Sequence, residues 1–102
     1  MSSNAYRVEI TRGDTYGPLE IRYEDSDGQP IDMTGYTVTW VLTLGSNEVP
    51  GTVDLDEEQG RMTLTVPHEV TAAIPQSVGS HRLRITAPIV KTLLKGRVTV
   101  DD

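Results

Sequence analysis

The chain has 102 residues, no cysteine and a net charge of −6, from fifteen acidic and nine basic side chains. This length predicts one domain over 1–102, and the missing cysteines exclude disulfides and thiolate metal sites. The acidic balance argues against a nucleic-acid partner held through its phosphates. The first residues lack a signal-peptide pattern and no apolar run approaches the ~20 residues of a membrane span, so we expect a protein made in a reducing cytoplasm.

Alternating apolar and polar residues predict two strands before the first long turn. These strands cover residues 6–11 and 19–24. Between them, Arg12-Gly13-Asp14 spells an integrin-binding tripeptide, but a strand end followed by a turn accounts for it. Residues 25–30 carry turn chemistry, because Asp and Ser side chains bond to nearby backbone and glycine accepts a positive φ. Residues 31–35 are then a short connector into the next strand.

Residues 35–44 form the clearest strand of the sequence. Val38, Trp40 and Leu42 lie on one side and threonines lie on the other, which is the period-two pattern of a half-buried strand. Trp40 is the only tryptophan and there is no phenylalanine, so we expect its indole to be the largest apolar group of the core. Burying it would remove roughly 150–250 Å² from water, worth a few kcal/mol at about 25 cal/mol per Å².

The second half of the chain alternates turns and short strands around one helical pattern. Val70, Ala73 and Ile74 recur at the spacing of one helix face. Pro67 suits a first helical position, so a helix is predicted over about 67–74, with its apolar side docked on the strands. In chain order, we also predict a polar loop at 45–50, a short edge strand at 52–55, a turn at 56–60, and strands at 62–66, 82–86 and 92–100.

The number and spacing of the strands indicate the fold class. About seven short strands with turn signals between them are typical of a β-sandwich. We therefore predict an all-β, immunoglobulin-like antiparallel sandwich with one short helix. Sealing a two-layer core around the indole would leave only the outer rims and turns free for function.

Residues that could carry metal or catalytic chemistry lack the required spacing. With Gly28 at the sixth position of a calcium loop, Tyr23 and Thr34 stand where carboxylates are required. In the acidic cluster at 54–58, Gly60 comes one place too late and Thr65 stands at the last position of the loop. The two histidines have no thiolates or paired spacing for zinc. No nucleophile elbow or glycine-rich phosphate loop occurs. We predict no metal, no cofactor and no enzymatic activity.

Four stretches, read in order, resemble the motifs of one known family. They are 12–19 (Arg-Gly-Asp-Thr-Tyr-Gly-Pro-Leu), 25–38 (Asp-Ser-Asp-Gly-Gln-Pro-Ile-Asp-Met-Thr-Gly-Tyr-Thr-Val), 66–75 (Val-Pro-His-Glu-Val-Thr-Ala-Ala-Ile-Pro) and 93–100 (Leu-Leu-Lys-Gly-Arg-Val-Thr-Val). The family is the N-terminal module of tailed-phage upper-baseplate (BppU-like) proteins, with related small prophage proteins. The similarity spans nearly the whole chain, and the matching residues are mainly those at which turns, strands and the helix begin or end. It implies a virion structural protein, assembled in the bacterial host cytoplasm with other virion proteins.

Three departures from that family pattern bear on the role. Val66 stands where the family has a threonine cap, and the hairpin at 87–91 is apolar where the family has an Asp-Gly-like turn. The chain also ends at Asp102, without the longer C-terminal region that carries receptor-binding parts in baseplate proteins. A tail or baseplate connector, a tail accessory protein and a capsid decoration protein therefore all fit the pattern.

Exposed apolar residues and an unpaired strand edge mark the predicted protein interface. The turn at 89–90 has two readings, a contact with another subunit or a fold back onto the core. We expect an oligomer within the particle, held by weak contacts that symmetry multiplies. The candidate interface residues are Tyr6 in the N-terminal arm, Thr52, Val53 and Leu55 in the edge strand, and Ile89 and Val90 in the turn.

Two functions from other classes compete with this one. A carbohydrate-binding module for host-surface glycans would need aromatic rings exposed in loops, for which only Tyr16 and Tyr36 are candidates. An accessory domain of a larger cytoplasmic enzyme complex would be recognised from neighbouring genes. Terminase, capsid and tail genes on either side would instead support the virion role.

Overall fold

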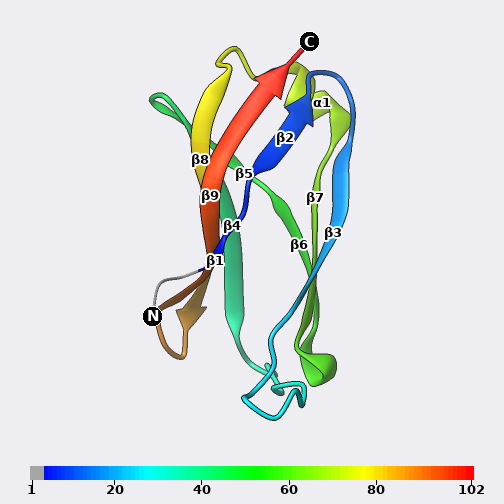
Figure 1. Ribbon diagram of the computed structural model, residues 1–102, viewed down its shortest axis with the longest axis vertical. Coiled ribbons are helices and arrows are strands. Elements are labelled where there is room, and N and C mark those ends of the chain that lie inside the picture. The colour runs from blue at the N-terminus through cyan, green and yellow to red at the C-terminus, as the bar shows by residue number, and fades with distance from the viewer. Residues whose placement is uncertain (1–3) are drawn as a thin grey trace.

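Two β-sheets packed face to face make up the computed structural model, which describes residues 4–102 (Figure 1). This confirms the predicted all-β sandwich. The larger sheet has the order β1 (Asn4–Ala5), β9 (Lys91–Asp101), β8 (Val78–Ala87), β4 (Thr37–Leu44) and β5 (Asn47–Pro50), and β2 (Val8–Thr11) also pairs with β9. The smaller sheet has the order β3 (Tyr16–Arg22), β7 (Arg61–Val66) and β6 (Thr52–Asp56); η1 (Glu57–Gln59) and α1 (His68–Ala72) complete the chain.

The N-terminal segment departs from a purely antiparallel arrangement. Both β1 and β2 run parallel to β9, whereas the other pairs are antiparallel. The predicted strand at 6–11 begins later, at Val8. Tyr6 lies between β1 and β2, where its N–H donates to the Lys95 carbonyl. Gly96 makes this approach possible, since a Cβ there would overlap the Tyr6 carbonyl.

Trp40 lies at the centre of the core, as the sequence predicts, with 1% of its surface exposed. Its ring centroid is 6.2 Å from that of Tyr16 in the small sheet and 6.1 Å, edge-on, from that of His81 in β8. Gly51, where the chain passes from β5 to β6, leaves room for the indole, because a Cβ there would overlap the ring. The indole therefore ties the two layers together.

A buried hydrogen-bond chain extends from Trp40 to the N-terminal segment. The indole Nε1–H donates to His81 Nδ1 over 3.1 Å, and His81 Nε2 lies 2.6 Å from the Tyr6 carbonyl. Because indole N–H only donates and a carbonyl only accepts, His81 is the neutral tautomer with its proton on Nε2. The histidine thus satisfies two buried groups at once.

The prediction of a polar loop at 45–50 is wrong, because Asn47–Pro50 form β5. Gly45 has a positive φ of 64° at the start of a two-residue turn, and the chain then pairs antiparallel with β4, from Leu44↔Asn47 to Val41↔Pro50. The turn is short enough for a tight hairpin. The strand escapes sequence analysis because Val49 is its only apolar residue besides the terminal proline.

The helix is shorter than predicted, and a polar residue faces the core. α1 covers His68–Ala72 with Pro67 as its N-cap, and Ala73 is exposed while Thr71 is buried. Thr71 Oγ1 accepts from the Gly13 N–H and donates to the Asp14 carbonyl. Arg12 donates from Nε to the Ile74 carbonyl over 2.7 Å and pairs with Asp102. The Arg-Gly-Asp triplet thus fastens the helix to the sandwich.

Candidate functional site

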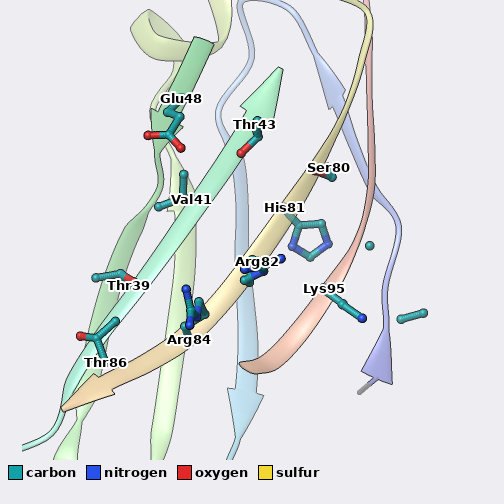
Figure 2. A pocket seen from close by; sticks show the side chains of 12 residues that line it. Thr39, Val41, Thr43, Glu48, Ser80, His81, Arg82, Arg84, Thr86 and Lys95 are labelled. Carbon is teal, nitrogen blue, oxygen red and sulfur yellow. The ribbon is translucent and has the colours of Figure 1, made fainter. Parts of the chain in front are cut away.

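A concave surface of about 520 Å³ lies on the outer face of the large sheet (Figure 2). β4 and β8 form its floor, since residues at alternate positions of a strand point to the same face. The side chains that contribute to it are Thr39, Val41 and Thr43 from β4, Ser80, Arg82, Arg84 and Thr86 from β8, Glu48 from β5 and Lys95 from β9.

The strand register gathers positive charge on this surface. Arg82 is directly opposite Lys95 on β9 and Val41 on β4, and Arg84 is opposite Thr39. Arg97 follows Lys95 by two positions and so shares its face. None of these four cations takes part in the ion pairs formed within residues 4–102. We call Arg82, Arg84, Lys95 and Arg97 the basic face.

Two features of the basic face cost stability. Like charges directly opposite on neighbouring strands repel, as Arg82 and Lys95 must. The Arg84 Nε atom is also buried and has no hydrogen-bond partner among the described residues. A buried donor without a partner costs about 1–3 kcal/mol, and a charged one costs more. A carboxylate placed between Arg82 and Lys95 would relieve the first of these costs.

Sequence analysis missed this face, although its signal is present. Arg82 and Arg84 alternate with buried Leu83 and Ile85 in β8, and Lys95 and Arg97 alternate in the same way in β9. Read strand by strand, each pair is only the solvated side of a half-buried strand. The pairing of β8 with β9 turns two ordinary strands into one charged surface on an acidic protein.

The predicted interface residues do not form one surface. Thr52, Val53 and Leu55 lie on β6 at the edge of the small sheet, as expected; Thr52 is exposed and the other two are half-buried. Tyr6 is 40% exposed beside β9, in the other sheet. Ile89 and Val90 form the turn between β8 and β9, with 51% and 66% of their surfaces exposed. The turn therefore does not fold back onto the core.

The two tyrosines considered for glycan binding are half-buried against the core. Tyr16 packs on Trp40, and burial raises its pKa to about 12, with further contributions from the neighbouring Tyr6 hydroxyl and from Glu9. Tyr36 also packs against the core cluster. Neither ring is presented as a flat exposed platform, so the structure does not favour the carbohydrate-binding alternative.

A second hollow, of about 610 Å³, lies at the end of the small sheet near η1. We call Asp54, Asp56, Glu57 and Glu58, which line it, the acidic end. Arg61 pairs with Asp56 over 2.9 Å, and Glu57 accepts from the Gly35 N–H. Across residues 4–102, no three His, Asp or Glu side chains are arranged to hold a metal ion. Within residues 4–102, no helix has the length and apolarity needed to cross a membrane.

Comparison with known proteins gives a likeness in fold to a solved structure. No protein-family model matches the sequence, and no curated protein does. The structure is similar to the N-terminal domain of phage TP901-1 ORF48, with a TM-score of 0.56 and 13% sequence identity, over 99% of this chain and 91% of that one. At this identity the likeness shows the fold alone. The chain is thus a β-sandwich of a type found in a phage protein, with a basic concave sheet face.

Proposed function

We propose that the chain is a non-enzymatic structural protein of a tailed-phage or prophage virion, acting by protein–protein binding in a symmetric assembly. The observation that carries the proposal is the likeness to a phage protein domain over 99% of this chain. The four motifs that resemble upper-baseplate modules support the same class and favour a tail or baseplate connector or accessory protein. Fold alone does not fix function, so the proposal also draws on the surface.

The chemistry of the concave face suits a macromolecular partner. Guanidinium and ammonium groups donate to carboxylates, often in bidentate pairs, and the threonine and serine hydroxyls around them donate or accept. A single contact of this kind is weak, because exposed ion pairs contribute only about 0–1 kcal/mol. Repetition around a particle raises the effective concentration of each contact, so weak pairwise binding suffices.

The decisive experiment is a protein inventory of purified virions from a strain that produces the particle. We expect the chain in the particles, in a copy number that matches the symmetry of the tail or baseplate, and a density map should place it there. Location on the capsid surface would favour a decoration protein. Complete absence from purified particles, with neighbouring genes that encode no virion proteins, would contradict the proposal.

The exposed turn between β8 and β9 can be tested separately as a contact. Ile89→Asp with Val90→Asp should leave the fold intact, because both side chains are largely exposed, and should lower incorporation into particles. Val78→Asp is the matched control, since Val78 is an apolar residue of the same sheet with 56% exposure. If both variants are incorporated like the unmodified chain, the turn is not a contact.

A further inference from the structure

We propose that the basic face of one copy of this chain binds the acidic end of a second copy, so that copies associate head to tail. This inference deepens the proposed function by naming a partner, and it has a test in solution that does not require the virion. It starts from charge: three cations of the basic face, Arg82, Arg84 and Lys95, share the concave surface with one carboxylate, Glu48. The acidic end has four carboxylates and one arginine.

The basic face is built to receive acceptors from outside the chain. β8 carries Arg82 and Arg84 and no acidic residue. Arg82 is held against Lys95 on β9 in a like-charge cross-strand pair, which a carboxylate between them would convert into attraction. The Arg84 guanidinium forms no ion pair within residues 4–102, so its charge is available to an incoming carboxylate.

The acidic end has carboxylates available to supply those oxygens. Asp54 and Glu58 are exposed, and neither accepts a hydrogen bond or forms an ion pair within the described residues, whereas Asp56 and Glu57 already have partners. Glu58 belongs to η1, which projects as a short turn at one end of the small sheet (Figure 1). The complementarity between the acidic end and the basic face is therefore one of charge, and the unpaired carboxylates lie where a second molecule can reach them.

The positions of the two surfaces determine the kind of assembly. The basic face is the outer side of the large sheet, and the acidic end belongs to the small sheet in the other layer (Figure 1). One copy cannot bring them together on itself. Because the two halves of the contact are different surfaces, the interface is heterologous, and such contacts close into rings or continue as helical stacks. This is the geometry of a protein repeated around a tail axis.

The first test measures self-association of the purified chain by sedimentation velocity over a concentration series at low salt. We expect the average mass to rise with concentration and to fall on added salt, which screens exposed charges. Arg82→Glu should weaken association at least tenfold. Arg22→Glu, an exposed strand arginine on the small sheet with the same change of charge, should leave it within about twofold. A chain that stays monomeric at every concentration and salt level overturns the proposal.

The second test mixes two variants that each lack one half of the contact. Arg82→Glu with Arg84→Glu removes the basic face, and Asp54→Lys with Glu58→Lys removes the acidic end. Each variant alone should be monomeric. An equimolar mixture should form a dimer that does not grow, because one intact basic face meets one intact acidic end. No dimer in the mixture, while the unmodified chain associates, would show a different interface and overturn the proposal.

Controls separate misfolding and other partners from a true negative. Circular dichroism and thermal unfolding establish that each variant is folded, and Arg82→Glu alone replaces the double variant if Arg84→Glu does not fold. Polyglutamate serves as a probe of the basic face. If a chain that never self-associates binds polyglutamate, the partner is an acidic segment of another protein. That result would exclude a second copy as the partner. Virion incorporation is measured independently, so it can succeed where self-association fails.

Discussion

The two sheets treat their charged residues in opposite ways. In the small sheet, both arginines are paired within the layer: Arg22 with Glu20 and Arg61 with Asp56, each over 2.9 Å. On the large sheet, the four cations of the basic face have no carboxylate partner among the described residues. The small sheet pairs its own arginines, whereas the large sheet leaves these four cations without an ion pair. The difference indicates where the large sheet offers positive charge to a partner.

The largest expected effect comes from removing the side chain that both layers share. Trp40→Ala should lower the free energy of unfolding by about 3–5 kcal/mol, out of a total of about 5–15 kcal/mol for a domain. The loss arises because the indole contacts Tyr16 in one sheet and His81 in the other. Urea unfolding followed by circular dichroism measures it. A loss below about 1 kcal/mol would mean that the layers are held together elsewhere.

The two histidines provide the next comparison. His81→Leu should cost about 1–3 kcal/mol, because the Trp40 indole N–H loses its buried acceptor and the Tyr6 carbonyl loses its donor. His68→Leu is the matched control, since His68 is exposed and a surface change usually stays within about 0.5 kcal/mol. Equal effects of the two substitutions on urea unfolding would contradict the bridging role of His81.

Alkaline pH should loosen the contact between Tyr16 and the core. Burial raises the pKa of Tyr16 in the folded chain from 10.0 to about 12, so folding favours the neutral phenol. Its contribution to stability is therefore complete below about pH 10 and is lost as the pH rises towards 12. A tyrosinate absorbance titration should show one late-ionising tyrosine, absent in Tyr16→Phe and kept in Tyr36→Phe. Its persistence in Tyr16→Phe would assign the shift to another residue.

The smallest expected effect tests the electrostatic contrast itself. Arg61→Gln should lower the free energy of unfolding by about 0.2–1 kcal/mol, the range for an exposed ion pair. Arg82→Gln should leave it unchanged or raise it by up to about 0.5 kcal/mol, because it relieves repulsion from Lys95. Thermal unfolding of the two variants side by side measures the difference. A larger loss for Arg82→Gln would mean that the basic face is stabilised within the chain.

Local patterns were sufficient to predict most of the sandwich. The alternation around Trp40 identified β4, its buried side and the central role of the indole. The same period-two reasoning located β6, β7, β8 and β9, although β8 extends further than predicted, to Val78–Ala87. These elements are readable because one face of each strand is buried and the other is solvated, which is the condition under which alternation appears in a sequence.

What escaped prediction depends on contacts between distant segments. The polar strand β5 has almost no pattern of its own and is defined by its hairpin with β4. Thr71 faces inward because the 12–14 turn supplies its partners, which no helical periodicity encodes. The basic face likewise exists only once β8 and β9 are paired. Sequence analysis predicts which segments form strands. The basic face arises from which strands pair, and the sequence of each strand does not reveal that pairing.

The parallel pairing of β2 with β9 has a consequence for how the chain reaches this state. The two strands stand at opposite ends of the printed sequence, with Val8 opposite Val98. Closing so long a loop costs entropy before any contact repays it, and proteins dominated by such distant pairings fold in milliseconds to seconds. During synthesis, β8 has no neighbour on one side until β9 emerges from the ribosome. β9, which is translated after its neighbours β2 and β8, is therefore the strand that covers the open edge of the nascent sheet and keeps it from pairing with other chains.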